Sequence, residues 1–468
     1  MAKLSAAEVQ AGTGGALARG SGGTVFSSVS IDTRTLQQGA VFFAIRGPNQ
    51  DGHRFVPDAL SRGALGAVVV SDYEYPGKLP DDRVLIKVED THQALKSLAM
   101  SVRRGWPGIL VGVTGSMGKT TTREFTAQVL QSGFRVYQTP GNYNNLFGLP
   151  LALFGLGFDY DIGIFEMGMS APGEIAEMCR IASPHMGIVT NVAPVHLEFF
   201  DSIEKIARAK AELAEALPAD GTLIYNADDP LVMRIAARFP GNRVSFGLSD
   251  RADVRAEKIE IVSLNRTRFQ ISCDGITRPA AVPFAGAHYV MNALPAVALG
   301  RQLKIASAQI IESLEKLKPV AMRGQILGFK EGFTVIDDSY NSNPRALMQM
   351  IDVLAGVSGF KRRILVAGEM LELGPHSDSL HAECGAYAAD HGVDMVAGVQ
   401  GAAHELVRAA AESRKPGPQT HFFSNSDSAA DFVCGAIRPG DLLLIKGSRG
   451  VHTERIVKRL LSEYESLN

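Results

Sequence analysis

Cysteine is scarce in this chain of 468 residues, and the four that are present lie far apart. They are Cys179, Cys273, Cys384 and Cys434, and no two of them form a C-x-x-C pair or the spacing of a metal finger. The sequence therefore gives no indication of a disulfide scaffold, a thiol redox centre or a zinc site. We expect the four thiols to be reduced and mostly buried, without a catalytic part.

Long apolar runs are also missing. Residues 1–23 have no basic segment followed by an apolar stretch, and no later segment offers about 18 uncharged apolar residues. We therefore expect a cytoplasmic protein without a membrane span. The formal net charge of -2 supplies no electrostatic reason to expect nucleic acid or an anionic membrane as a partner.

The length predicts several domains, because one domain usually takes about 100 to 200 residues. Segments typical of strands and helices alternate after residue 108, as in residues 162–166, 174–181, 186–191, 202–217 and 222–225. This alternation predicts a parallel sheet with helices on its faces.

Two boundaries divide the chain, at Trp106-Pro-Gly108 and at Lys318-Pro319. We predict an N-terminal domain over 1–106, a central domain over 107–318 and a C-terminal domain over 319–468. The predicted class is α/β: a small N-terminal α/β domain, a central parallel sheet with a β-meander over 247–283, and a C-terminal Rossmann-like open sheet. The last of these has no G-x-G-x-x-G fingerprint.

The clearest motif is Gly112-Val-Thr-Gly-Ser-Met-Gly-Lys-Thr-Thr-Thr122, which lies between an apolar strand and a helix ending near residue 130. Gly115 and Gly118 allow a tight turn that aims backbone N–H groups at an anion, Lys119 can reach terminal phosphates, and the Thr120 hydroxyl can hold Mg²⁺. The spacing departs from the strict P-loop pattern because Val113 occupies the first glycine position. The alternative is a glycine-rich turn that opens an ordinary helix, but the strand-to-helix context favours nucleotide binding and a central sheet of the P-loop ATPase type.

Reactive side chains follow two further predicted strands. Glu166 follows one of them, and Asn191 and then His196 follow the other. Since ligands of open α/β sheets bind outside the carboxyl ends of the strands, Thr120, Glu166 and His196 are expected to share one metal-phosphate site. Taken singly, Glu166 could instead be a helix cap or an ion-pair partner, and His196 an ordinary loop histidine. A histidine is an unusual ligand for Mg²⁺ and would also suit Mn²⁺.

Further motifs follow in a specific order, namely Thr139-Pro-Gly-Asn-Tyr-Asn-Asn145, Glu166-Met-Gly168, Thr190-Asn-Val-Ala-Pro-Val-His196, Gly286-Ala-His-Tyr-Val-Met-Asn292, Asp337-Asp-Ser-Tyr-Asn-Ser-Asn-Pro344 and Lys446-Gly-Ser-Arg449. Together with the phosphate loop they resemble the Mur ligases of peptidoglycan synthesis, from about Ser30 to near the C-terminus. The first and fifth of these motifs point to the branch of the family that adds D-alanyl-D-alanine.

The resemblance implies an ATP-dependent amide ligase of three domains. Its reaction joins D-alanyl-D-alanine to UDP-N-acetylmuramoyl-tripeptide through an acyl phosphate and releases the pentapeptide product, ADP and phosphate. The implied cofactors are ATP and Mg²⁺, with two ions, and the partners are these two small substrates, bound by a monomer. The choice between diaminopimelate and lysine at the third position of the tripeptide is not indicated.

The resemblance also implies roles for individual residues. The ATP-binding positions match Gly115, Ser116, Met117, Gly118, Lys119, Thr120, Thr121, Asn292, Arg323 and Asp338. The catalytic positions match Lys119, Glu166, His196 and Lys210, and the metal positions match Thr120, Glu166, His196 and, as a carbamate, Lys210. The UDP-sugar positions match Asp32, Thr33 and Arg34, and the acceptor dipeptide positions match Asn341, Asn343, Lys446 and Arg449.

Some residues do not follow from the resemblance in a simple way. Tyr289 stands where the family pattern has an asparagine, and Thr33 stands where serine is commoner. From its helical position alone, Lys210 would be a solvated surface residue. Three other hypotheses stay open: a related ligase that adds another amino acid, or glutamate to folate; a nucleotide-driven switch; and a binding protein whose loop is unused.

Overall fold

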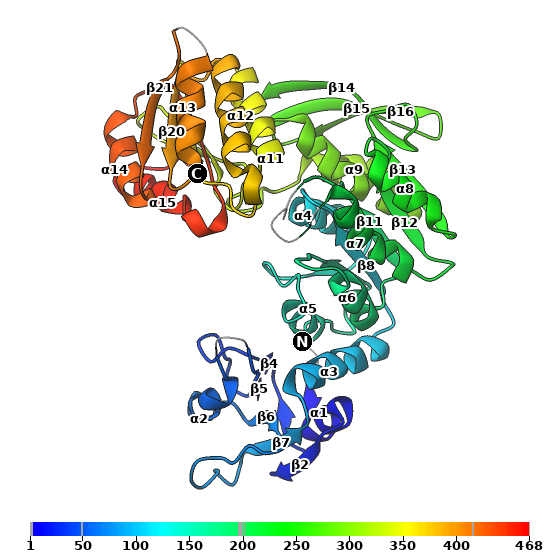
Figure 1. Cartoon of the computed structure of the whole chain (residues 1–468). Helices are drawn as coiled ribbons and strands as arrows, with labels where there is room; N and C mark the ends of the chain where they lie inside the picture. The colour runs from blue at the N-terminus through cyan, green and yellow to red at the C-terminus, as the bar shows by residue number, and fades with distance from the viewer. Residues whose placement is uncertain (1–2, 48–49, 195–199, 201, 414–415, 468) are drawn as a thin grey trace.

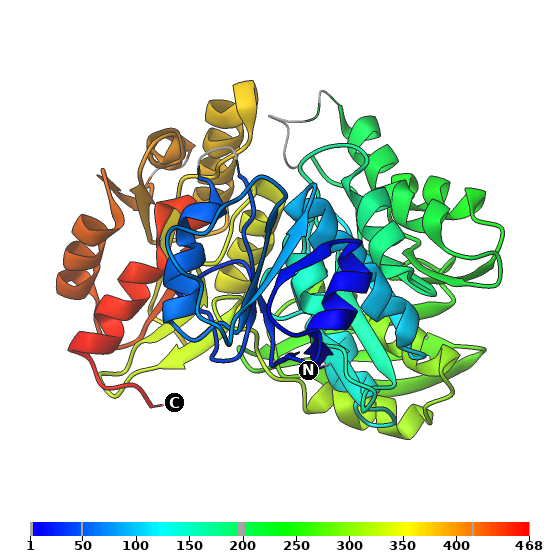
Figure 2. The ribbon, with the colours of Figure 1, turned by 90° about the horizontal axis from the view of Figure 1, so that it is seen from below.

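The computed structural model describes residues 3–47, 50–194, 200, 202–413 and 416–467. Within these ranges the chain forms three larger sheets, over residues 16–88, 109–282 and 325–446. Figure 1 shows them in chain order around a bend, and Figure 2 shows the N-terminal sheet in front of the other two when the molecule is seen from below. Helices accompany each sheet, and the predicted α/β class is confirmed.

The N-terminal sheet has the order β2-β7-β6-β5-β4, in which only β2 runs antiparallel to its neighbour. Its strands are β2 (Ala16–Arg19), β4 (Val29–Ser30), β5 (Val41–Phe43), β6 (Gly66–Val70) and β7 (Val84–Val88). The short strands β1 (Leu4–Ser5) and β3 (Val25–Phe26) pair separately, and the helices are α1 (Ala6–Thr13), α2 (Val56–Ser61) and α3 (Thr91–Gly105). Strands β5 and β6 are buried along their whole length, which explains their continuous apolar sequence.

Helix α3 joins the N-terminal sheet to the central one. It contacts α1 on one side and α5 (Gly148–Leu153) and α6 (Glu174–Ala182) on the other. Directly after it comes Trp106, the only tryptophan of the chain, whose buried indole N–H donates to the carbonyl oxygens of Gly157 and Tyr160 at 3.2 Å. The predicted linker is therefore anchored on the central part of the molecule.

The central sheet has the order β16-β15-β14-β13-β12-β11-β8-β10-β9. Its strands are β8 (Ile109–Thr114), β9 (Val136–Gln138), β10 (Ile162–Glu166), β11 (Met186–Val189), β12 (Thr222–Asn226), β13 (Asn242–Gly247), β14 (Val254–Ser263), β15 (Arg266–Cys273) and β16 (Ile276–Val282). The other helices of this part are α4 (Lys119–Leu130), α7 (Ile203–Ala216), α8 (Pro230–Arg238), α9 (Ala287–Gln302) and α10 (Ser307–Glu315). Across the sheet, the strands from β9 at one edge to β14 run parallel, and β8 is among them. The predicted meander is the antiparallel extension formed by β14, β15 and β16.

Strand β8 marks the point at which the order of the central sheet reverses. Its two neighbours, β10 and β11, both follow it in the chain and lie on opposite sides of it. The loops after β8, β10 and β11 therefore leave the same edge of the sheet next to one another. A crevice at such a switch point is where open α/β sheets bind their ligands.

The C-terminal sheet has the order β17-β18-β22-β19-β20-β21, and only β17 is antiparallel to its neighbour. Its elements are β17 (Gln325–Gly328), β18 (Thr334–Asp338), α11 (Pro344–Gly356), β19 (Arg362–Gly368), α12 (Ser377–Asp390), β20 (Met395–Val399), α13 (Ala403–Ser413), β21 (Gln419–Phe423), α14 (Ser426–Ala436), β22 (Asp441–Lys446) and α15 (Glu454–Glu463). Leu264, at the turn of the β14–β15 hairpin, packs into the same apolar cluster as Leu347 of α11.

Two expectations from composition can be compared with the structure. Cys179 and Cys384 are buried, Cys273 and Cys434 are half-buried, and all four are free. None of the helices in the described ranges has the length and apolar character needed to cross a membrane.

Candidate active site

The phosphate loop connects the end of β8 to the start of α4. Gly115 has φ +151° and Gly118 has φ +76°, values that side chains rarely allow. A Cβ atom would lie 1.9 Å from Thr190 Oγ1 at Gly115 and 2.3 Å from Asn292 Oδ1 at Gly118. Both glycines are therefore required by space as well as by conformation.

Asn191, two residues after the end of β11, holds the loop in shape. Its carbonyl oxygen accepts a hydrogen bond from the Ser116 N–H (2.9 Å), and its side-chain oxygen accepts one from the Met117 N–H (2.9 Å). The Thr190 hydroxyl donates to the Met117 carbonyl oxygen at 2.7 Å. These two loop N–H groups are thus engaged by protein, and their hydrogen bonds fix the shape of the loop.

Lys119 begins α4 and lies over the loop that precedes it. Its ammonium donates to the carbonyl oxygen of Gly115 at 2.9 Å, which places the charge beside the cradle. No side chain of the described residues caps α4, so its first N–H groups and its positive end face the same space. Burial lowers the pKa of Lys119, and the Glu166 carboxylate opposes this shift.

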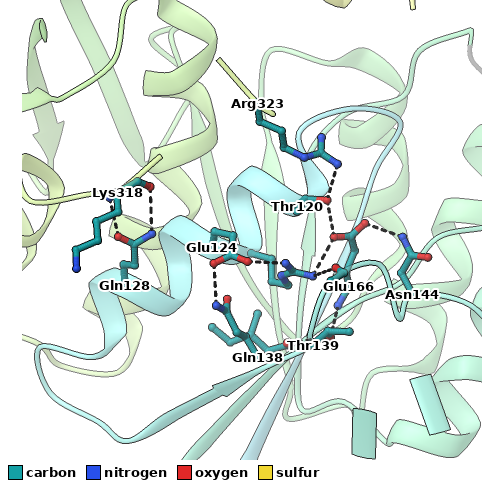
Figure 3. A network of polar contacts seen from close by, with 12 residues as sticks. Thr120, Glu124, Gln128, Gln138, Thr139, Asn144, Glu166, Lys318 and Arg323 are labelled. Atoms are coloured by element: carbon teal, nitrogen blue, oxygen red, sulfur yellow. Dashed lines mark hydrogen bonds and ion pairs between the residues drawn. The ribbon is translucent and has the colours of Figure 1, made fainter. Parts of the chain in front are cut away.

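Glu166 ends β10 and is only 2% exposed. Its carboxylate accepts hydrogen bonds from the Thr120 hydroxyl and from Asn144 Nδ2, both at 2.8 Å, as Figure 3 shows. The Glu166 N–H donates to Thr139 Oγ1 at 3.1 Å, which fixes the end of the strand. Two of the three residues expected to share a metal-phosphate site therefore touch each other.

The pair of Thr120 and Glu166 fits a magnesium ion. Their two oxygen atoms lie 2.8 Å apart, close to the separation of about 3 Å expected for neighbouring ligands in an octahedral Mg²⁺ site. Among the residues with assigned positions no three His, Cys, Asp or Glu side chains gather. A site with the single carboxylate of Glu166 suits Mg²⁺, which usually takes one or two carboxylates together with water and substrate phosphates.

Arg123 also belongs to this network, although its helical position carries no signal that would separate it from a surface arginine. Its guanidinium donates to the Gly141 carbonyl oxygen (2.9 Å), lies 3.5 Å from the Glu166 carboxylate and pairs with Glu124 at 2.6 Å. The side chain is 2% exposed. This buried cation connects the 139–145 loop to the carboxylate that ends β10.

The C-terminal part reaches the phosphate loop through Arg323. Arg323 Nη2 donates to the Thr120 hydroxyl at 3.1 Å, and its guanidinium lies 4.3 Å from the centre of the Tyr340 ring. Asp338, at the end of β18, pairs with the buried Lys446 at the end of β22 at 2.5 Å. The parallel pairing of β18 with β22 places these two residues side by side.

The residues expected to bind the dipeptide lie around the same loop. The Asn341 carbonyl oxygen accepts a hydrogen bond from Lys446 at 2.9 Å. Asn343 caps α11 through its side-chain oxygen, which accepts from the Ala346 N–H at 2.9 Å. Arg449 lies 5.7 Å from the centre of the Tyr340 ring. Asn341, Asn343 and Lys446 line one cavity with Glu166, and their substrate role stays a prediction.

Lys210 and His196 complete the predicted metal set. Lys210 lies on α7 and is 2% exposed, so the expectation from its helical position, a solvated surface residue, is wrong. Burial and the positive charge of Lys119 hold the pKa of Lys210 well below its usual value. His196 lies outside the described residues.

The residues expected to hold the UDP-sugar lie on the N-terminal sheet, after β4. Arg34 donates to the Asp32 carboxylate at 2.6 Å and is 85% exposed, and this hydrogen bond lowers the pKa of Asp32. None of Asp32, Thr33 and Arg34 lines the two cavities at the phosphate loop. The contacts at the phosphate loop do not test the role of these three residues, which stays a prediction.

Two adjoining cavities meet at the phosphate loop. The first, of about 650 Å³, lies on the α9 side and is lined by Thr121, Asn226, Asp228, Tyr289 and Asn292 among others. The second, of about 470 Å³, lies on the β10 side and is lined by Lys119, Thr120, Asn144, Glu166 and Asn341 among others. Met117, Gly118, Arg323, Asp338 and Lys446 border both. The loop therefore has room for a nucleoside on one side and for a second substrate on the other.

Replacing Gly118 with alanine tests the loop. Because the new Cβ would collide with the Asn292 side chain at a left-handed φ, we expect ATP affinity to fall about tenfold and the free energy of unfolding to fall by about 1–3 kcal/mol. Calorimetric titration with ATP and thermal unfolding measure the two effects. The control is Gly435→Ala, where the added Cβ meets nothing within 4 Å and both quantities should hold or rise. Unchanged ATP affinity in Gly118→Ala would contradict this assignment.

Comparisons with known proteins cover the whole of this arrangement. Three family models match the chain: Mur ligase family, catalytic domain over 25–103; Mur ligase middle domain over 113–300; and Mur ligase, glutamate ligase domain over 322–449. The UDP-N-acetylmuramoyl-tripeptide--D-alanyl-D-alanine ligase of Bacillus subtilis (strain 168) is 34% identical over 438 residues, which are 94% of this chain and 94% of that protein.

Solved structures give the same result. The crystal structure of MurF from Acinetobacter baumannii is similar with a TM-score of 0.87 and 27% identity, covering 99% of this chain and 100% of that one. The MurF ligase from Thermotoga maritima in complex with ADP is similar with a TM-score of 0.80 and 28% identity, covering 93% and 97%. The similarity thus extends over all three larger sheets.

Proposed function

The chain belongs to the Mur ligase family, and on that premise we propose that it acts as MurF does, joining D-alanyl-D-alanine to UDP-N-acetylmuramoyl-tripeptide at the expense of ATP. The observation that carries the proposal is the convergence of Lys119, the Thr120–Glu166 pair and Arg323 on one loop between two cavities. The order of the sequence motifs and the similar known proteins point to the same branch of the family.

The first step is the activation of a carboxylate. The terminal carboxylate of the tripeptide attacks the γ-phosphorus of ATP, which forms an acyl phosphate and releases ADP. Lys119 and the first N–H groups of α4 bind the phosphates and offset the charge that spreads over the transferring group, where positioning and electrostatics supply most of the rate. Mg²⁺, held by Thr120 and Glu166, would add positive charge next to the phosphates of ATP.

The second step is the formation of the amide. The amine of D-alanyl-D-alanine attacks the acyl carbon, and phosphate leaves from the tetrahedral intermediate. Arg323 and Asp338 are proposed to contact ATP, while Asn341, Asn343, Lys446 and Arg449 orient the dipeptide. No protein nucleophile is needed, and exclusion of water by the C-terminal part protects the acyl phosphate from hydrolysis.

The remaining assignments rest on the resemblance. We propose a second Mg²⁺ held by His196, which orients substrate and metal, and by a carbamate of Lys210; the burial of the Lys210 side chain supports the latter. Asp32, Thr33 and Arg34 are proposed to bind the UDP-sugar. The proposed domains are 1–106, 107–318 and 319–468, and the protein is proposed to act as a monomer in the cytoplasm, in cell-wall synthesis and hence in cell shape and division.

Release of phosphate tests the proposed function. With UDP-N-acetylmuramoyl-tripeptides ending in diaminopimelate or in lysine, we expect phosphate release from ATP that depends on D-alanyl-D-alanine and on one of the two tripeptides. Measurement of phosphate with and without each substrate also identifies the third residue.

The same assay separates the rival functions. A single amino acid that replaces the dipeptide, or a folate that replaces the nucleotide substrate, would indicate a related ligase. Turnover of ATP at full rate without either substrate would indicate a nucleotide-driven switch. Either result would overturn the proposed function.

A further inference from the structure

A short connector joins the central sheet to the C-terminal sheet, between the end of α10 and the start of β17, and it carries Arg323. Two side chains from different helices of the central part hold its backbone. Gln128 of α4 binds one end, at Lys318, and Tyr289 of α9 binds the other, at Arg323. These hydrogen bonds hold the backbone of the connector and leave the Arg323 guanidinium itself to other partners.

At the first end, the side-chain amide of Gln128 pairs with both backbone groups of one residue. The Lys318 N–H donates to Gln128 Oε1 at 2.7 Å, and Gln128 Nε2 donates to the Lys318 carbonyl oxygen at 3.4 Å (Figure 3). Thr120 lies on the same helix about two turns earlier, roughly 12 Å away along the axis. The five residue-to-residue steps from Lys318 to Arg323 can span about 17 Å when extended, so the connector is long enough to run back along α4.

At the second end, the Tyr289 hydroxyl donates to the carbonyl oxygen of Arg323 at 3.0 Å. The next residue, Gly324, has φ +71°, and a Cβ there would lie 1.7 Å from the hydroxyl oxygen. Tyr289 is 5% exposed, and its ring stacks on Phe284 with 4.9 Å between the centres. Burial raises the pKa of Tyr289 well above its usual value, so the hydroxyl keeps the proton that it donates.

Between these two points the Arg323 guanidinium reaches Thr120, whose hydroxyl in turn donates to Glu166. The guanidinium also lies over the ring of Tyr340. If the connector were unrestrained, placing the guanidinium at Thr120 would cost the conformational entropy of both the connector backbone and the arginine side chain. Because the backbone is already fixed, part of this entropy has been lost in advance.

We propose that Tyr289 and Gln128 are positioning residues for Arg323: they hold the connector on the central part so that the guanidinium stays at Thr120, beside the reacting phosphate. This inference rests on the proposed function, since it assigns the arginine to the ATP-dependent step. The tyrosine, which stands where the family pattern has an asparagine, thereby gains a role on the connector.

The test is a double-mutant cycle on the full chain. We expect Tyr289→Phe, which removes only the hydroxyl, to lower kcat about tenfold and to leave the KM for D-alanyl-D-alanine unchanged. Arg323→Met lowers kcat on its own, and adding Tyr289→Phe to it should cost less than a further twofold, because the arginine that the tyrosine positions is already gone. Gln128→Ala should behave in the same way, with a smaller loss of about threefold.

Matched controls separate positioning from packing. Tyr137→Phe removes another hydroxyl that donates to a backbone carbonyl oxygen, that of Ala152 at 2.7 Å, and Gln309→Ala removes a glutamine that donates to the Ser132 carbonyl oxygen at 3.4 Å. Neither of these hydrogen bonds involves the connector, and both variants should keep the wild-type kcat. Thermal unfolding of every variant confirms that the protein is folded.

Two results would overturn the inference: an unchanged kcat in Tyr289→Phe, or a tenfold loss that persists in the Arg323→Met background, which would mean direct contact with the substrate. Failure of the proposed function looks different, because the wild type itself would then show no phosphate release that depends on the tripeptide and on D-alanyl-D-alanine. In that case the same cycle is measured on the affinity for ATP by calorimetry, and additive changes there also overturn the inference.

Discussion

Replacement of Lys119 by methionine is expected to lower kcat about a thousandfold while the protein stays folded. The ammonium lies over the phosphate loop, at 2.9 Å from the Gly115 carbonyl oxygen, where it can turn to an incoming phosphate. Methionine keeps most of the length and the apolar stem of lysine, so the loss concerns the charge. The measurement is phosphate release at saturating ATP, tripeptide and dipeptide.

A control at the surface makes the result specific. Lys458 of α15 is exposed and far along the chain from the loop, and Lys458→Met should keep full activity. If Lys119→Met kept even a tenth of the wild-type kcat, the loop would not be the site of phosphoryl transfer. A loss that appeared only in the KM for ATP would limit the lysine to ground-state binding.

A loss of similar size, about a thousandfold, is expected for Lys210→Ala, with partial recovery in short-chain carboxylates such as acetate or formate. The buried amine has a lowered pKa, and a neutral amine is the form that attacks CO₂ to give a carbamate. The alanine variant leaves space in which a small carboxylate can supply the missing anionic oxygen. The measurement is phosphate release with increasing carboxylate concentration.

The carbamate also predicts dependence on CO₂ and pH. Since a lower pH protonates the amine, wild-type activity should fall as pH decreases, and at fixed pH it should fall in CO₂-depleted buffer and return with bicarbonate. The Lys119→Met variant is the control, because carboxylates should not restore it. Full activity of Lys210→Ala, or a loss that no carboxylate recovers in a folded protein, would refute the carbamate.

The contacts of the phosphate loop could be predicted in part, because they follow from strand order. Thr120 and Glu166 come directly after a glycine turn and a buried strand, and parallel strands place such residues at one edge. Their direct hydrogen bond confirms the expected juxtaposition. Asn191 was placed at the same edge, but its role in holding the loop depends on distances that the order of residues does not contain.

Contacts between sheets could not be predicted in this way. Arg323 reaches Thr120 across a sequence separation of 203 residues, and that contact depends on how two sheets pack together. Arg123 and Lys210 are charged residues on helices, a pattern typical of a solvated face, yet both are almost fully buried. Only the shape of the surrounding structure distinguishes them from surface residues.

The secondary structure shows the same division. Long apolar strands such as β10 were predicted at their observed positions, since burial on both faces leaves a continuous signal. The edge strand β21 leaves only a weak signal in the sequence, because none of its residues is buried. The continuation of the central sheet into β15 and β16 was predicted as a meander, and it joins that sheet through the short parallel pairing of β13 with β14.

The single tryptophan has a practical consequence. Because Trp106 is buried at the end of α3 and its indole is bonded to Gly157 and Tyr160, intrinsic emission excited at long ultraviolet wavelengths comes from that joint alone. The native protein is therefore already labelled at one place, where the N-terminal sheet meets the rest. A shift of the emission on addition of the sugar nucleotide would report a rearrangement at Trp106. Titration with adenine nucleotide is the control, and it should leave the emission unchanged.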